Sequence, residues 1–164
     1  MNKSGIAGLF GSKEGLQLAT VAYARQVFTE AVVDPARGAE RGLPRLRRTV
    51  LAWLDYSRGR VFEGGCFFRS AATELDARTP GPVRDAVAEA LRDWDGYLAR
   101  LLAAAVERGE LAPGTDAAQL VFEIDAFLDR ADSESVLRGD AGAYDRAARA
   151  IEGALVACGA APAG

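Results

Sequence analysis

The sequence predicts an all-α protein with a single domain. Its 164 residues include 33 alanines and only three isoleucines, a bias toward residues that favour helices and away from the β-branched residues that favour strands. Apolar residues recur at intervals of three and four over long stretches, which is the period of an amphipathic helix. With 49% hydrophobic and 26% charged residues, the composition is that of a globular chain and not of a disordered one.

The first expected helix begins after Ser12 and runs to about Val33. Serine is a preferred helix N-cap, and Glu14 lies in the first turn, where the helix dipole favours a negative charge. The apolar positions that follow have helical spacing, and their stripe is wide enough to predict a central helix. They are Leu16, Ala19, Tyr23, Val27 and Ala31.

Proline and glycine residues between positions 34 and 42 separate this helix from the next, which is expected over Leu43–Arg58. A loop over residues 59–65 precedes a short helix from Cys66 to about Ala77. The strongest helical pattern starts at Pro82, a residue suited to the first helical position, and stops before Gly109.

Two further helices complete the pattern. Asp116 or Thr115 can cap the first of them, whose early part is apolar and whose later part, Asp129–Glu134, is polar. The second is amphipathic and runs from about Tyr144 to Cys158. The sequence therefore predicts six helices and no strand.

The residues that the chain lacks exclude several classes of site. Without histidine, the commonest general base and metal ligand is missing, and the two distant cysteines cannot complete a zinc site. No nucleophile and base stand at motif spacing and no glycine-rich phosphate loop is present, so we expect neither an enzyme nor a metal or cofactor.

The cellular location also follows from the residue pattern. Two isolated cysteines and the lack of a signal peptide favour the cytoplasm, and no apolar stretch is long enough for a membrane span. Cys66 follows two glycines at an expected helix start, where the dipole stabilises a thiolate, but an inert packed cysteine is the favoured interpretation.

The charges are distributed unevenly. Residues 1–60 carry ten Lys and Arg against five Asp and Glu, whereas the rest of the chain is acidic, for a net charge of −3. A surface that approaches a polyanion is therefore expected in the first third of the chain.

Residues 3–16 carry the most informative motif, Lys-Ser-Gly-Ile-Ala-Gly-Leu-Phe-Gly-Ser-Lys-Glu-Gly-Leu. It resembles the end of the DNA-binding region in the TetR family of transcriptional regulators, in which a recognition helix is followed by a phenylalanine, a short turn and Ser-Lys-Glu. The matching positions are Phe10, Ser12, Lys13, Glu14 and Leu16.

A second stretch is also similar to this family. Gly109, Glu110 and Leu111, followed by Asp116, are similar to the loop between the two long regulatory helices of these proteins. In the opening motif, Ala7 and Leu9 stand where the family usually has an aromatic residue and a histidine or aromatic residue.

The resemblance implies a division of the chain into three parts. Residues 1–11 are the remnant of a helix-turn-helix recognition helix and its turn, residues 12–158 are a helical bundle like the TetR-type ligand-binding and dimerisation domain, and residues 159–164 are a flexible tail. The first helices of the three-helix DNA-binding unit are missing from the sequence, and a helix-turn-helix needs them to hold the recognition helix.

Three groups of site residues follow from the resemblance. The DNA contacts are expected at Lys3, Ser4, Gly5 and Lys13, since phosphates attract lysines, hydroxyls and helix N-termini. An apolar effector cavity is expected among Trp53, Tyr56, Phe67, Phe68, Arg69, Trp94, Tyr97, Phe122 and Asp125, with Thr73 as a further polar candidate, although simple core packing remains the alternative for each aromatic residue. A homodimer interface is expected at Phe127, Leu128, Ile151 and Leu155.

The resemblance thus implies a ligand-responsive, DNA-binding transcriptional regulator, a repressor in most such cases, with an incomplete helix-turn-helix. Its partners would be a DNA operator for the intact parent protein, a small apolar effector and a second copy of the chain, with no membrane. The alternative is a stand-alone small-molecule-binding or protein-interaction helical module that does not bind DNA.

Overall fold

The structure, a computed structural model, describes residues 10–75 and 80–162. Within these ranges the all-α prediction is confirmed, because the chain forms helices and no strand. The helices are α2 (Lys13–Phe28), the π-helix η1 (Thr29–Val33), the 3-10 helix η2 (Asp34–Ala36), α3 (Leu43–Arg58), α4 (Phe67–Leu75), α5 (Pro82–Glu107), α6 (Ala117–Arg138) and α7 (Gly142–Ala157). No helix in this part of the chain is long and apolar enough to cross a bilayer.

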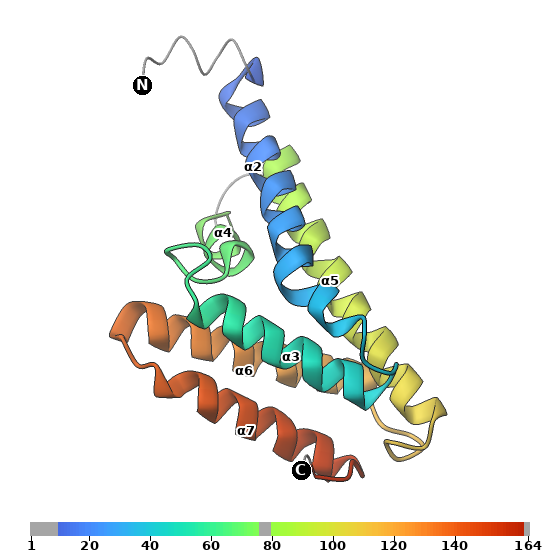
Figure 1. Cartoon of the computed structure of the whole chain (residues 1–164). Helices are drawn as coiled ribbons and strands as arrows, with labels where there is room; N and C mark the ends of the chain where they lie inside the picture. The colour runs from blue at the N-terminus through green and yellow to red at the C-terminus, as the bar shows by residue number, and fades with distance from the viewer. Residues whose placement is uncertain (1–9, 76–79, 163–164) are drawn as a thin grey trace.

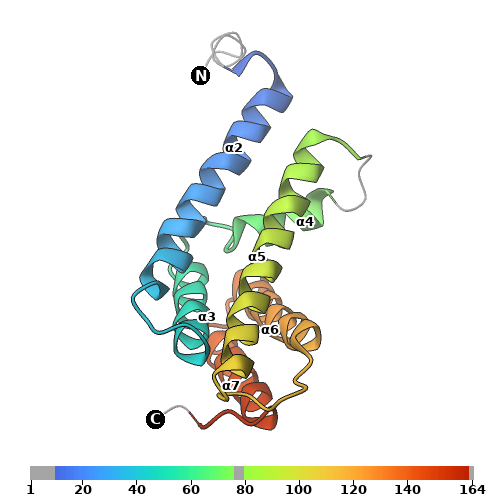
Figure 2. The same ribbon diagram turned by 90° about the vertical axis from the view of Figure 1, so that its right-hand side faces the viewer.

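Two groups of helices make up the molecule (Figure 1). Helices α2 and α5 run side by side in the same direction, and their first halves project beyond the rest of the protein (Figure 2). The other group is a layer in which α3 and α6 run in the same direction and α7 packs antiparallel against α6. The short helix α4 lies beside the projecting pair and contacts α5.

The expected helix starts agree with the observed capping. The Ser12 hydroxyl accepts a hydrogen bond from the Gly15 backbone N–H at 2.9 Å, so it caps α2. Of the two candidates for α6, Asp116 is the cap, because its carboxylate accepts a hydrogen bond from the Gln119 backbone N–H at 3.0 Å. Pro82 occupies the first position of α5.

Glu110, in the loop between α5 and α6, contacts the first residue of α3. Its Oε2 accepts a hydrogen bond from the Leu43 backbone N–H at 2.7 Å, and therefore caps α3 from a distant part of the chain. Gly42 has a φ of +102°, and a Cβ there would lie 2.2 Å from this carboxylate. Although partial burial alone would raise the pKa of Glu110, the hydrogen bond from Leu43 and the neighbouring Arg108 lower it below its usual value.

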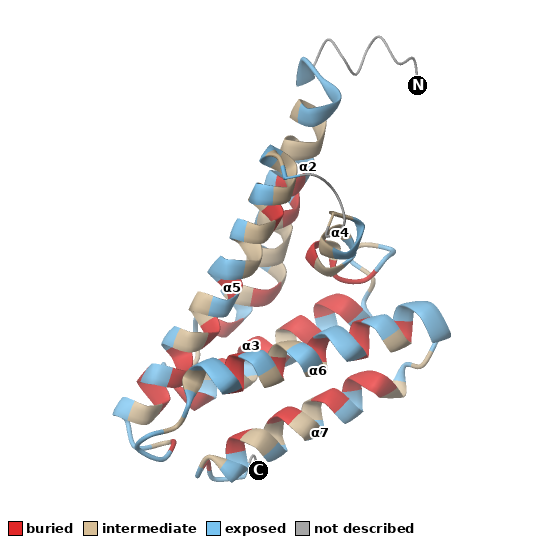
Figure 3. Cartoon of the chain, turned by 180° about the vertical axis from the view of Figure 1, so that it is seen from behind, coloured by how far each residue is buried: buried red, intermediate tan, exposed pale blue. Residues whose placement is uncertain are grey.

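The core lies where the helical layer meets the lower halves of α2 and α5. Tyr23, which belongs to the stripe that predicted a central helix, is 61% exposed, whereas Val21 and Ala24 are buried. Because the upper part of α2 packs mainly against α5, only a narrow face of it is covered (Figure 3). No residue of α2 before Val21 is buried, so the prediction of a central helix is wrong for Tyr23 and for the first half of α2.

Three of the four residues expected in a dimer interface face the core of their own chain. Leu128, Ile151 and Leu155 are at most 2% exposed and belong to the hydrophobic core cluster. Helical periodicity identifies a buried face without telling which partner covers it. Phe127 is half-buried and lies in a groove between α6 and α7.

The expected flexible tail packs on the bundle for at least part of its length. Ala160 is 5% exposed, and its backbone N–H donates to the Leu155 carbonyl at 3.1 Å. The Ala161 carbonyl accepts a hydrogen bond from Arg47 at 2.6 Å. The domain therefore continues to at least residue 161.

Candidate functional site

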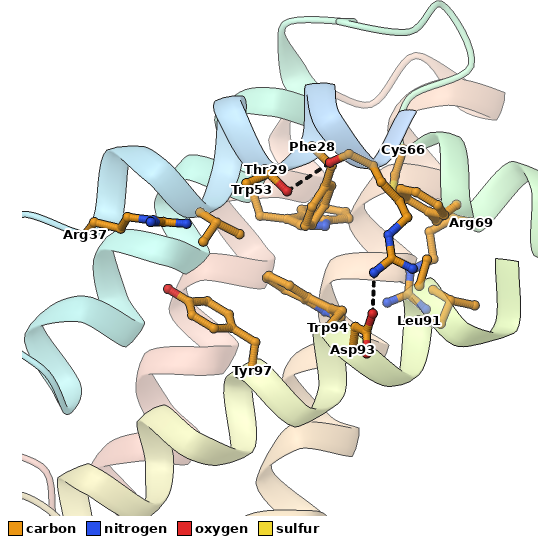
Figure 4. A pocket seen from close by; sticks show the side chains of 14 residues that line it. Phe28, Thr29, Arg37, Trp53, Cys66, Arg69, Leu91, Asp93, Trp94 and Tyr97 are labelled. Atoms are coloured by element: carbon orange, nitrogen blue, oxygen red, sulfur yellow. Dashed lines mark hydrogen bonds and ion pairs between the residues drawn. The ribbon is translucent and has the colours of Figure 1, made fainter. Parts of the chain in front are cut away.

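A cavity of about 250 Å³ lies between α2, η1, α3, α4 and α5 (Figure 4). Its wall combines aromatic and aliphatic side chains with three arginines. The lining residues are Arg25, Phe28, Thr29, Val33, Arg37, Trp53, Cys66, Phe68, Arg69, Ala90, Leu91, Asp93, Trp94 and Tyr97. A concave, mainly apolar site with a few polar groups is the usual form of a small-molecule pocket.

Phe28 is at the centre of the aromatic wall. Its ring meets Trp94 edge-on with centroids 5.2 Å apart, and it meets Phe68 edge-on at 6.0 Å. Trp53, from α3, is 1% exposed and lines the cavity from the opposite group of helices. The edge-on contacts of Phe28 with Trp94 and Phe68 favour this arrangement of the three rings.

Asp125 is satisfied by two partners on the far side of this wall. It forms an ion pair with Arg69, and its Oδ1 accepts a hydrogen bond from the Trp94 indole at 3.2 Å. Although burial alone would lower it, the pKa of Arg69 is raised by Asp125. The carboxylate inside an otherwise apolar run is thus paired, and it fixes Arg69 and Trp94 in place.

The other two arginines belong to exposed ion pairs. Arg25 pairs with Asp93, and Arg37 Nε lies 2.8 Å from Asp34 Oδ1, one helical turn away. Exposed pairs of this kind contribute only about 0–1 kcal/mol, so a ligand can replace either acidic partner at little cost.

The residues expected at the cavity fall into two sets. The structure places Trp53, Phe68, Arg69, Trp94 and Tyr97 in the lining. The others lie elsewhere: Tyr56 is buried behind Phe28, Phe67 lines a separate groove between α2, α4 and α5, Asp125 lies behind Arg69, and Thr73 is exposed with its hydroxyl on the Arg69 carbonyl.

Phe122 does not belong to the cavity, because it is 69% exposed. It stands two residues from both Leu120 and Ile124, which are buried, and two residues turn an α-helix by about 200°. The apolar run of α6 therefore includes one side chain on the outer face.

Sequence reasoning missed Arg25, Phe28 and Arg37 as cavity residues. Phe28 directly follows Val27 of the expected apolar stripe, but such a stripe does not show which helix it meets. The structure also shows the π-helix η1, which contributes Thr29 and Val33 to the wall. Such segments frequently occur at functional sites, but sequence periodicity does not reveal them.

Cys66 lines the cavity and is 2% exposed. Burial raises the pKa of its thiol to about 11, so the neutral form dominates at neutral pH. This agrees with the interpretation of an inert packed cysteine.

A buried polar network lies next to Cys66, centred on Asp132 of α6. Asp132 accepts hydrogen bonds from the Cys66 backbone N–H at 2.9 Å and from the Ser57 hydroxyl. Ser57 is 2.9 Å from the Tyr144 hydroxyl, which also accepts a hydrogen bond from Arg60 at 3.0 Å. The network joins α3, α6 and α7 to the cavity wall, and the sequence showed only an unusually polar half of one helix.

Among residues 10–75 and 80–162, no group of three or more acidic or cysteine side chains is placed to hold a metal ion. Of the expected DNA contacts, Lys13 is the exposed first residue of α2, and Lys3, Ser4 and Gly5 lie outside the described residues.

Comparisons with known proteins agree with this architecture. A family model described as "Tetracyclin repressor-like, C-terminal domain" matches residues 42–151. The fold is similar to the crystal structure of a TetR transcriptional regulator from Chloroflexus aurantiacus J-10-FL, with a TM-score of 0.82 and 25% sequence identity over 89% of this chain and 73% of that one. No curated protein sequence matches the chain.

Proposed function

Because this chain belongs to the tetracycline repressor-like (TetR) family of transcriptional regulators, which are not enzymes, we propose that it is a ligand-responsive regulator whose cavity binds a small apolar effector. Occupation of the cavity changes the affinity of the intact protein for an operator, most simply as a repressor that the effector releases. The regulator acts in the cytoplasm, where its operator DNA lies.

The position of α2 is the observation that carries this proposal. Its last turn supplies Arg25 and Phe28 to the cavity wall, and η1 continues the same wall. Its other end begins at Ser12, next to the segment that resembles the end of a recognition helix. An α-helix of 16 residues is about 24 Å long, so a small tilt at Phe28 becomes a larger displacement at Lys13.

We assign residues 1–11 to the end of a recognition helix and its turn, and residues 12 onward to the regulatory domain. Lys3, Ser4, Gly5 and Lys13 are the proposed DNA contacts, with lysines and backbone N–H groups directed to phosphates. An effector that favours one tilt of α2 shifts the equilibrium between two arrangements of these contacts.

A homodimer is the proposed form that reads a palindromic operator. The groove between α6 and α7 is the surface proposed for it, because Phe127, four small residues and three charged ones line it. The small residues are Ala131, Ala143, Ala147 and Ala150, and the charged ones are Arg130, Glu134 and Arg146. On the outer faces, Phe122 is 69% and Leu137 is 80% exposed, and both add apolar area.

A mobility-shift assay tests the proposal, with genomic DNA that flanks the gene as the probe. It compares this chain with a form extended at its amino end by the in-frame sequence upstream of Met1. We expect the extended form to bind with an affinity that falls steeply with salt, because phosphate contacts dominate such binding.

Equal and weak binding by both forms would contradict the DNA-binding proposal. It would favour the alternative, a module that binds a small molecule or a protein without engaging DNA.

A further inference from the structure

The side chains that line the cavity carry more positive than negative charges. Three arginines line it against a single acidic residue, Asp93. Arg69 is committed to Asp125 on the far side of the wall and is largely buried, so its charge is already neutralised. Arg25 and Arg37 have only exposed partners, so they remain available for a bound anion.

Arg37 and Tyr97 form one end of the cavity. Figure 4 shows the Tyr97 hydroxyl directed to the side from which Arg37 enters, whereas Asp93, the ion-pair partner of Arg25, lies at the other end. The Tyr97 hydroxyl is 3.4 Å from the buried Thr49 hydroxyl, a long contact that leaves it free to donate a better hydrogen bond. A guanidinium and a phenol at one end of an apolar cavity match a carboxylate.

The remaining wall is apolar and of limited size. Phe28, Trp53 and Trp94 stand between the two polar ends (Figure 4). The volume of about 250 Å³ is below the roughly 300 Å³ at which drug-sized pockets begin. A ligand with a single substituted ring fits this space better than a large fused polycyclic one.

We propose that the effector class is a small aromatic monocarboxylate, with its carboxylate between Arg37 and the Tyr97 hydroxyl and its ring against Phe28, Trp53 and Trp94. This inference rests on the proposed function and narrows the apolar effector to an anionic one. The bound carboxylate replaces Asp34 as the partner of Arg37, because the Arg37–Asp34 pair is exposed and contributes little, whereas the carboxylate also accepts a hydrogen bond from the Tyr97 hydroxyl.

The two tryptophans provide a direct measurement of binding. The sequence contains only two, Trp53 and Trp94, and both line the cavity, so quenching of intrinsic fluorescence reports its occupation. The probes are 4-tert-butylbenzoate and 4-tert-butylbenzamide, which match in shape and differ in charge. Isothermal titration calorimetry provides an independent Kd for each.

We expect the benzoate to bind about tenfold or more tighter than the benzamide, as a charge-assisted hydrogen bond implies. In Arg37→Gln this preference falls to about threefold or less, and in Tyr97→Phe it falls partway. The matched control is Arg92→Gln, which removes an exposed arginine of α5 outside the lining and should leave the preference unchanged. Circular dichroism checks that each variant is folded.

Several results would overturn the inference. Equal binding of the two probes would show that the cavity does not select an anionic ligand, although it would still bind an effector. If Arg92→Gln lowered the preference for the benzoate as much as Arg37→Gln does, the preference would reflect the overall charge of the protein. The carboxylate would then not be bound at Arg37. Failure of both probes to bind would also reject this ligand class, and the DNA assay would still decide the proposed function.

Discussion

The Asp132 carboxylate of α6 accepts a hydrogen bond from the backbone N–H of Cys66 at 2.9 Å. Cys66 lines the cavity, and α6 is one of the two helices proposed to form the dimer. The contact is close on both sides, since a Cβ on Gly65 would lie 2.2 Å from the same carboxylate. One buried acidic side chain therefore connects the cavity wall to the helix pair.

Removal of this carboxylate should be costly. We expect Asp132→Ala to lower the free energy of unfolding by about 2–4 kcal/mol, because Ser57 and the Cys66 N–H lose their acceptor inside the core. Asp132→Asn keeps one oxygen acceptor and should cost less. Urea denaturation measures both, with the exposed neighbour Ser133→Ala as a control expected within about 0.5 kcal/mol of the wild type. A loss for Asp132→Ala no larger than for the control would contradict the network.

The cap that Glu110 provides for α3 gives a second prediction. Glu110→Ala should lower the free energy of unfolding by about 1 kcal/mol, the usual contribution of a helix N-cap. Because the pKa of Glu110 is lowered in the folded protein, its contribution is present above the usual carboxyl value of 4.5 and is lost as the pH falls below it. The difference in stability between wild type and Glu110→Gln should therefore shrink in acid. A difference that stays constant or grows from pH 7 to pH 3 would contradict the cap.

The buried thiol of Cys66 should make the folded protein less stable at alkaline pH. Its pKa is about 11 in the folded protein against 9.0 for an ordinary thiol, so the folded state holds the proton more tightly. Its contribution is complete below pH 9 and is lost as the pH rises toward 11, by up to about 2–3 kcal/mol. Chemical denaturation of the wild type and Cys66→Ala over this range measures the difference between them. If that difference did not change with pH, the thiol would not be buried as described.

Tyr56 offers the opposite case, a polar group whose removal should not harm the protein. Its hydroxyl is buried and makes no well-formed hydrogen bond within the described part of the chain, although the Phe67 backbone lies near it, and burial raises the pKa of this phenol. An unsatisfied buried hydroxyl costs about 1–3 kcal/mol, so Tyr56→Phe should leave stability unchanged or raise it. Thermal unfolding compares the two proteins. A clear fall in Tm for the variant would show that the hydroxyl has a partner in solution.

The sequence predicted the helices better than their contacts. The bounds Leu43–Arg58 agree with α3 because an amphipathic stretch stands between Gly42 and Gly59, and local signals of this kind act within one helix. The burial of Leu128 and Leu155 within their own chain depends on which helices meet, and no helical period encodes that. Asp132 was visible only as an unusual charge, because its partners Ser57 and Cys66 are more than 60 residues away.

The central claim is that a ligand in the cavity acts on α2, and hydrogen exchange measured by mass spectrometry tests it most directly. The comparison is between the free chain and the chain saturated with 4-tert-butylbenzoate. The account predicts slower exchange in the second half of α2 and in η1, with a change that extends along α2 to its start at Lys13. Slower exchange confined to α4 and α5, with α2 unchanged from end to end, would contradict it.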